Sequence, residues 1–249
     1  MRAAWAAVLL AAGCASVPRT EVIAHRGGTG PDGTVAGCLR SLEMGVRYLE
    51  LDVRPTRDGE AVILHDPTVD RTTDGSGPVA EMTLAELKRL DAGAKFDSAF
   101  RGERIPTVAE VLRAVGPRGV VLLELKVPDA ADAVVRAIRE EGAFERAVVR
   151  TPDRALLRRI RAEEPRVRLG TMSADLDVEG LDLAAFTPLR NELLTPESVA
   201  RLQAQGVAVW GTNTNDPAVM RRLVAAGVDG IITDRPATLL EILKEGGAP

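Results

Sequence analysis

The sequence predicts an α/β fold, a single (β/α)8 barrel, and two observations carry this prediction. Eight short apolar β runs alternate with amphipathic helical stretches along the chain, an order that favours a parallel sheet. The length of 249 residues is also the usual size of one barrel of this kind. Because no internal repeat, linker or low-complexity tract divides the chain, we expect one barrel domain over 20–249.

The first element is an export signal rather than part of the fold. Residues 1–16 read MRAAWAAVLLAAGCAS, an Arg and a short apolar run before Ala-Gly-Cys, too short for a permanent span. The ending resembles a bacterial lipobox, which would place lipid on Cys14 and anchor the protein to a membrane. An ordinary secretory signal cut near Ala15 is the alternative. We therefore expect residues 1–19 to be signal and linker, and an exported protein: a lipoprotein, or else periplasmic or secreted.

The predicted strands and helices then follow in alternation. The predicted strands are EVIAH (21–25), RYLELDV (47–53), VVLLELK (120–126), RAVVR (146–150), VRLGT (167–171), LAAFT (183–187), VAVWGT (207–212) and GIITD (230–234). The predicted helices between them are Val35–Met44, Ala131–Glu141, Asp153–Glu163, Pro196–Gln205, Pro217–Ala226 and Pro236–Lys244. Several begin with Pro and are followed by Gly, which is ordinary helix punctuation.

One segment interrupts the alternation after the second strand. Residues 54–82 hold an Asp58-Gly59 turn between two extended runs and continue through a Gly-rich loop. In a barrel this segment is a small insertion on the face where the βα loops build the active site.

The composition excludes several classes of function. The net charge is -4, with 32 basic and 36 acidic residues well mixed, so no basic face for nucleic acid is expected. Aromatic residues make up 3% of the chain, which leaves no stacking platform for single strands. Two Cys cannot form a disulfide framework, and Cys38 is expected to pack as a small buried apolar group.

Polar residues inside apolar strands indicate a site. Glu50 and Asp52 alternate with apolar residues in RYLELDV, and Glu124 and Lys126 do the same in VVLLELK. Burying such groups is costly unless they pair or bind a cation, and an internal Glu124–Lys126 pair is the plain structural alternative. Three carboxylates without Cys or His suit a hard divalent cation, Mg²⁺ or Ca²⁺.

The chain has two His, and both follow apolar strand segments. His25 ends VIAH and His65 ends AVILH, on the side expected for the carboxylates. Two groups that titrate near neutrality suit general acid and general base catalysis. Arg26 can clamp an anion, and Lys126 can contact a phosphate as a point charge. A cation site, two His, Arg and Lys together indicate phosphoryl chemistry.

At these motifs the sequence resembles the glycerophosphodiester phosphodiesterase family. The shared segments are AHRGG (24–28), LELDVRPTRDGEAVILHDPTVDRTTDGSGPV (49–79), LAELKRLDAG (84–93), IPTVAEVL (105–112), LELK (123–126), VWGTN (209–213) and GVDGIITDRP (227–236). The resemblance implies a TIM barrel with a small insertion after strand two. It implies a divalent cation on Glu50, Asp52 and Glu124. It also implies the remaining roles: His25 and His65 as acid/base pair, Arg26 and Lys126 on the phosphate, Trp210 beside the glycerol.

Two segments depart from the family pattern. Pro31-Asp32-Gly33-Thr34 stands where the family usually has Pro-Glu-Asn-Thr, so the carboxylate has a shorter arm and the amide is lost. Trp210-Gly211-Thr212-Asn213 stands where Trp-Thr-Val-Asn is usual. Neither departure changes a predicted ligand or His.

These observations predict an enzyme that hydrolyses small-molecule glycerophosphodiesters to glycerol 3-phosphate and an alcohol. We assign His25 as base and His65 as acid, with either water or the neighbouring glycerol hydroxyl as nucleophile. One alternative is a lysophospholipase D-type phosphodiesterase, which would need an apolar channel beside the barrel mouth. The other is a non-catalytic glycerophosphodiester-binding lipoprotein, which would have no use for an acid/base pair.

Overall fold

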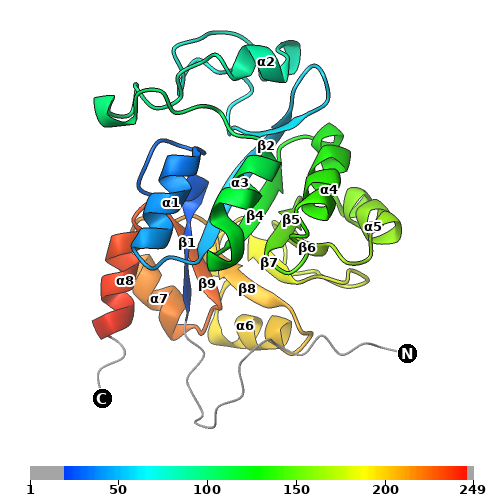
Figure 1. Ribbon diagram of the computed structural model, residues 1–249. Helices are drawn as coiled ribbons and strands as arrows, with labels where there is room; N and C mark the ends of the chain where they lie inside the picture. Colours follow the sequence, from blue (N-terminus) through cyan, green and yellow to red (C-terminus); the bar gives the residue numbers. More distant parts are fainter. Residues whose placement is uncertain (1–19, 246–249) are drawn as a thin grey trace.

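The computed structural model describes residues 20–245, which form a closed barrel of parallel strands surrounded by helices (Figure 1). The strands are β1 Glu21–Ala24, β2 Tyr48–Pro55, β3 Ala61–Ile63, β4 Val120–Leu125, β5 Ala147–Arg150, β6 Arg168–Ser173, β7 Ala185–Pro188, β8 Ala208–Gly211 and β9 Gly230–Thr233. Their order is β1-β9-β8-β7-β6-β5-β4-β2-β3, and a parallel β1–β2 pairing closes the barrel. The predicted (β/α)8 fold is confirmed.

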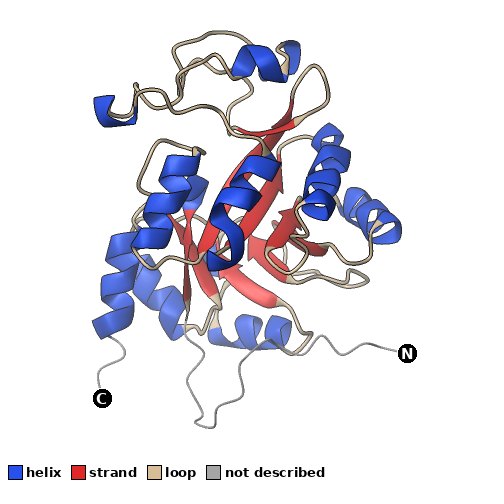
Figure 2. Ribbon diagram, in the orientation of Figure 1, coloured by secondary structure: helices blue, strands red, loops and turns tan. Residues whose placement is uncertain are grey.

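The helices lie outside the strands, as Figure 2 shows. They are α1 Val35–Glu43, α2 Leu84–Leu87, α3 Val108–Val115, α4 Ala131–Glu140, α5 Arg154–Glu163, α6 Pro196–Gln203, α7 Pro217–Ala225 and α8 Pro236–Glu245. Each predicted strand and helix overlaps an observed one. The sequence prediction omitted α2 and α3, although both begin with a capping box, Thr83 with Glu86 and Thr107 with Glu110.

The insertion after β2 is longer than predicted. It spans 56–107, beyond the expected end at residue 82, and contains β3, which pairs antiparallel with β2, as well as α2. It buries its own apolar cluster, which includes Val69, Leu87 and Ile105. Because this cluster is separate from the barrel core, the insertion is a small packed unit above the barrel mouth rather than a plain loop (Figure 1).

The strands are apolar because both of their faces are buried. Outward-facing residues such as Leu49 and Leu123 pack with the helices in the main core. Inward-facing residues form a second cluster that fills the barrel, made of Ile23, Leu122, Val148, Ala185, Trp210 and Ile232. Each fully buried large side chain contributes about 1.5–3 kcal/mol to folding, so this interior is a packed core and not a channel.

Register places the polar residues of neighbouring strands beside one another. Asp52 on β2 is the partner of Glu124 on β4, and Glu124 is the partner of Arg150 on β5. The strands are parallel, so these residues share the carboxyl end of the barrel, where the βα loops begin. Polar groups therefore replace apolar ones in the uppermost layer of the barrel interior.

Two further findings bear on the sequence predictions. Cys38 is fully buried on α1, which confirms its expected packing role, and burial raises the pKa of its thiol to about 12. Within 20–245, no helix is both long and apolar enough to cross a membrane. Cys14 and the rest of the predicted signal lie outside the described residues.

Candidate active site

Three carboxylates form the centre of the site. One oxygen each from Glu50, Asp52 and Glu124 lies within 4.8 Å of the others, which brings the predicted ligand set together. Glu50 and Asp52 are buried, at 1% and 3% exposure, because both project from β2 into the barrel. We call these three residues the carboxylate cluster. Three negative charges in so small a buried volume require compensation by cations.

Among residues 20–245, Arg150 and Lys126 make the shortest ion pairs with the carboxylate cluster. Arg150 donates from one nitrogen to Glu124 Oε2 at 2.6 Å and to Glu50 Oε1 at 3.1 Å. Lys126 Nζ lies 2.6 Å from Glu124 Oε1 and 3.0 Å from Asp52 Oδ1. The internal Glu124–Lys126 pair that the sequence left open is therefore present, and it forms within the site.

Compensation is uneven across the carboxylate cluster. Burial, and then the neighbouring Asp52 charge, raise the pKa of Glu50 to about 7 despite its contact with Arg150. Burial also acts on Glu124, but Arg150 and Lys126 outweigh it and hold the pKa of Glu124 below its usual value. The difference follows from geometry, because both cations contact Glu124 and only Arg150 reaches Glu50.

One further observation supports a divalent cation at the carboxylate cluster. Asp52 Oδ2 is buried and has no hydrogen-bond partner among the described residues, a costly state for a carboxylate oxygen. Arg26 Nε lies 3.6 Å away, too far for a hydrogen bond. Three hard oxygen donors with an unpaired oxygen among them suit Mg²⁺ or Ca²⁺.

Arg26 adopts a strained backbone conformation. Its φ of 51° and ψ of 33° are left-handed, and it is the one non-glycine residue between 20 and 245 with positive φ. A non-glycine residue in this region costs of order 1 kcal/mol and persists where surrounding contacts impose it. Here the backbone N–H donates to Glu50 Oε2 at 3.2 Å, and the guanidinium lies between Asp52 and Asp32.

His25 is held by residues that follow β8 and β9. Its Nδ1 lies 2.5 Å from Asp234 Oδ1, and Asp234 also accepts from Asn213 and Asn215. Although burial opposes it, these bonds to Asn215 and His25 lower the pKa of Asp234. Because an ionised carboxylate only accepts, the Nδ1 atom that faces Asp234 carries a proton, and Nε2 is the ring nitrogen on the side of the carboxylate cluster. That Nε2 lies 3.9 Å from Glu50 Oε2. We call His25, Asp234, Asn213 and Asn215 the His25 network.

His65 is held by residues of the insertion. Its Nδ1 lies 2.7 Å from Asp66 Oδ1, and Arg71 Nε donates to Asp66 Oδ2 at 2.6 Å. Burial opposes ionisation of Asp66, but the bonds from Arg71 and His65 prevail and lower its pKa. Arg71 also donates to Asp32 at 2.7 Å. We call His65, Asp66, Arg71 and Asp32 the His65 network. Among residues 20–245, the Nε2 atom of His65 has no hydrogen-bond partner.

The departure at Asp32-Gly33 has a structural account. Asp32 keeps the carboxylate of the family pattern and accepts from both Arg26 and Arg71. Gly33 has a φ of 67°, and a Cβ there would lie 2.9 Å from Ile63 Cγ2. This position therefore requires a left-handed residue without a side chain, and Thr34 still caps α1.

Trp210 is buried among the apolar residues inside the barrel. It is 4% exposed and belongs to the apolar cluster inside the barrel. Its ring packs edge-to-face on Tyr48, with centroids 6.4 Å apart. Its proposed contact with glycerol remains a prediction.

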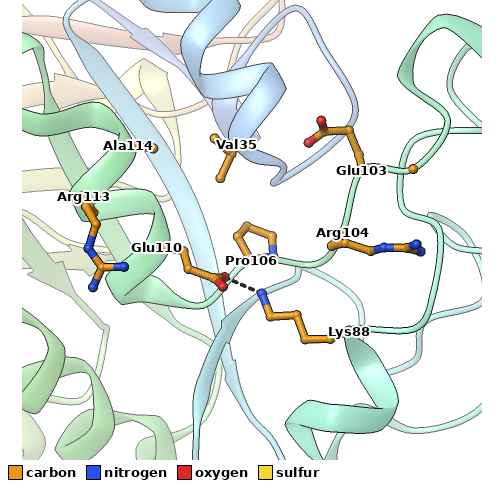
Figure 3. Close-up of a pocket in the computed structure, with 9 residues that line it drawn as sticks. Val35, Lys88, Glu103, Arg104, Pro106, Glu110, Arg113 and Ala114 are labelled. Carbon is orange, nitrogen blue, oxygen red and sulfur yellow. Dashed lines mark hydrogen bonds and ion pairs between the residues drawn. The ribbon is translucent and has the colours of Figure 1, made fainter.

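A surface cavity of about 510 Å³ lies away from this site, between α1, α3 and the insertion (Figure 3). Lys88 forms an ion pair with Glu110 at its edge, as the figure shows. None of the predicted site residues lines this cavity. It marks the seam where the insertion meets the barrel.

Comparison with known proteins agrees with this geometry. Residues 25–238 match the model of the glycerophosphoryl diester phosphodiesterase family. The chain belongs to this family. It is 37% identical to a glycerophosphodiester phosphodiesterase of Caldanaerobacter subterraneus over 92% of this chain and 100% of that protein. The predicted enzyme class, a phosphoric diester hydrolase, is confirmed.

Solved structures of the glycerophosphodiester phosphodiesterase family share the fold. An Oleispira antarctica phosphodiesterase, solved with the product sn-glycerol-3-phosphate, is 27% identical with a TM-score of 0.81 over 90% of this chain and 96% of that one. An Agrobacterium tumefaciens glycerophosphodiester phosphodiesterase is also 27% identical, with a TM-score of 0.74 over 88% of this chain and 99% of that one.

The sequence prediction assigned no role to several residues of this site. Arg150 ends RAVVR, Asp234 ends GIITD, and Asn213 ends VWGTN. Each is a polar residue that ends or directly follows an apolar strand, the same signal that pointed to Glu50 and Glu124. Asp66 and Arg71 lie in the family segment 49–79, but no strand or helix periodicity marks them because they belong to the insertion loop.

Proposed function

We propose that this enzyme hydrolyses glycerophosphodiesters to glycerol 3-phosphate and an alcohol with a divalent cation and the His25/His65 pair. One observation carries the proposal: a cluster of three carboxylates, two of them buried, has a Glu50 oxygen 3.9 Å from Nε2 of His25, in a family of phosphodiesterases. The Oleispira relative crystallised with sn-glycerol-3-phosphate supports the nature of the product.

Glu50, Asp52 and Glu124 would hold the cation, which would be Mg²⁺ or Ca²⁺. When bound, the ion supplies positive charge that stabilises the negative phosphoryl oxygens. Arg26 and Lys126 add to that charge from the protein. Lys126 uses two of its three N–H donors on Asp52 and Glu124, so one donor remains for a phosphate oxygen.

The two His would transfer protons at different atoms of the substrate. His25 lies against the carboxylate cluster, and its Nε2, when unprotonated, would accept the proton of the nucleophile. Water as nucleophile would give glycerol 3-phosphate directly, whereas the glycerol 2-hydroxyl would give a cyclic phosphate that water then opens. His65 lies on the insertion, 34% exposed, and can protonate the departing alkoxide with Nε2. In both, the aspartate at Nδ1 stabilises the imidazolium while it exists.

Product analysis tests this proposal. The purified enzyme is stripped with EDTA and given glycerophosphocholine, other glycerophosphodiesters and a lysolipid, with and without Mg²⁺ or Ca²⁺. We expect glycerol 3-phosphate and free alcohol from the glycerophosphodiesters only when the ion is restored. Full activity after stripping would end the metal proposal, and turnover of the lysolipid alone would replace the substrate class.

We further propose that the protein is exported and anchored by lipid on Cys14. The support is the apolar run that ends in Ala-Gly-Cys. Expressed with its own signal, the protein should enter the detergent phase, and Cys14→Ser should return it to the aqueous phase. A soluble wild-type protein beginning at Ala15 or later would replace the anchor with plain secretion.

A further inference from the structure

Arg150 is the most deeply buried cation of the site. It ends β5, and its side chain is 4% exposed, against 20% for Lys126. Its guanidinium contacts Glu50 and Glu124 on one nitrogen and Thr187 Oγ1 on the other, at 3.3 Å. Its Nε is buried and has no hydrogen-bond partner within residues 20–245. The carboxylate cluster is therefore the main compensation for the burial of this charge.

The charges of the site indicate that Arg150 affects how tightly an added cation binds. Three carboxylates carry up to three negative charges. Arg150 and Lys126 return two positive ones at 3.1 Å or less, and Arg26 Nε lies farther off, 3.6 Å from Asp52. The Arg150 guanidinium places its positive charge directly beside Glu50 and Glu124. A divalent cation on Glu50 and Glu124 would share their oxygens with Arg150 at short range, where charges interact strongly.

We propose that Arg150 is a resident countercharge that balances the carboxylate cluster in the metal-free enzyme and weakens divalent-cation binding. It would thereby set the ion concentration at which the enzyme becomes active. This inference rests on the proposed metal site, and it assigns Arg150 a role in ion affinity rather than in proton transfer.

An opposite effect of Arg150 has to be weighed. The guanidinium also holds Glu50 and Glu124 in position, so its loss could loosen the site and weaken ion binding. Both carboxylates, however, stand on neighbouring hydrogen-bonded strands, and the Glu50 side chain is only 2% exposed. They have little room to move, so we expect removal of the charge to dominate.

The test is a binding titration on metal-stripped protein. Wild type and Arg150→Gln are titrated with Ca²⁺ and with Mg²⁺ by calorimetry, and thermal melting is followed with EDTA and with excess ion. We expect Arg150→Gln to bind the ion at least about tenfold more tightly. In EDTA, the variant should melt at a lower temperature than wild type. Its melting temperature should rise more than that of wild type when the ion is added, because tighter binding stabilises the folded state more.

Two control variants isolate the charge at this position. Arg146→Gln removes the same charge just before the other end of β5, where Arg146 donates to the carbonyls of Leu112 and Glu141. Its ion affinity should match that of wild type. Arg150→Lys keeps the positive charge but loses the fork of donors, and its affinity should lie closer to wild type than to Arg150→Gln.

The outcomes separate this inference from the proposed function. Equal or weaker ion binding by Arg150→Gln, with wild type binding the ion, overturns the role of Arg150 alone. If wild type binds neither ion, the metal part of the proposed function falls and this inference falls with it. An Arg150→Gln variant that is unfolded in EDTA should fold when the ion is added; failure to fold in both conditions contradicts the inference.

Discussion

An aspartate contacts Nδ1 of each His of the site, but the two aspartates are fixed by different parts of the molecule. His25 follows β1, and its partner Asp234 is fixed by Asn213 and Asn215 from the loop after β8. His65 lies on the insertion, and its partner Asp66 is fixed by Arg71, an ion pair that is partly exposed. His25 is 17% exposed and His65 34%. The first network stands on residues that follow barrel strands, and the second joins the insertion to the first βα loop through Asp32.

This difference indicates a division of labour. A group that activates a nucleophile beside the carboxylate cluster has to be placed accurately, and the strand ends of a barrel provide such placement. A group that protonates a variable alcohol has to tolerate different head groups, and His65 stands on the insertion, which has an apolar core of its own. We therefore expect the base in the His25 network and the acid in the His65 network.

The largest effect is expected from removing either His. His25→Ala and His65→Ala should each lower kcat on glycerophosphocholine by about 10²–10⁴-fold, the usual contribution of a general acid or base. Circular dichroism should confirm that each variant is folded. Turnover equal to that of wild type in both variants would remove the acid/base pair from the account.

The aspartates behind the two His should give the next largest effects. Asp234→Asn and Asp66→Asn should each reduce kcat by roughly tenfold to a hundredfold, because the amide no longer stabilises the imidazolium. Asp216→Asn is the matched control: Asp216 caps α7 near the His25 network, and Asn also caps helices well. Loss of activity in the control as large as in Asp234→Asn would mean that the loop, and not the aspartate, matters.

Arg71→Met weakens the His65 network only. Arg71 joins Asp66 to Asp32 but is 47% exposed, so its ion pairs are screened by water. We expect a loss of roughly fivefold or less in kcat, without a change in ion affinity. A weaker affinity for the ion in this variant would show that the two networks are not separate.

The smallest effect is on stability in acid. Asp66 and Asp234 both have lowered pKa values, so each contributes stability above its ordinary pKa that is lost as the pH falls through the lower, folded value. Melting temperatures measured between pH 5 and about 3 should therefore decline. Asp66→Asn should reduce that decline, by no more than about 2 °C because the pair is partly exposed. A steeper decline in the variant would contradict the expected direction of the Asp66 contribution to stability.

The sequence predicted the barrel because its signals are local. Apolar runs give the strands, and Pro and Gly give the helix ends, so every predicted element overlaps an observed one. The carboxylate cluster was also predictable, since i and i+2 in a strand share a face and parallel strands end together. The same rule, applied to Arg150 and Asp234, would have found those residues as well.

The rest depended on contacts between distant residues. Asp32 and Arg71 are 39 residues apart, and their bond forms only because the insertion folds over the first βα loop. The insertion has its own core, which gives no periodic signal distinct from that of a long loop. Likewise, the sequence shows only that Gly33 lacks the usual amide side chain. The structure adds that Ile63 lies too close for a side chain at this position.

A change of leaving group tests the division of labour most directly. A nitrophenyl glycerophosphodiester releases its alcohol without a proton, so it needs the base but not the acid. We predict that this substrate restores much of the activity of His65→Ala relative to wild type and leaves His25→Ala impaired. Restoration of His25→Ala alone would contradict the assignment of the two networks.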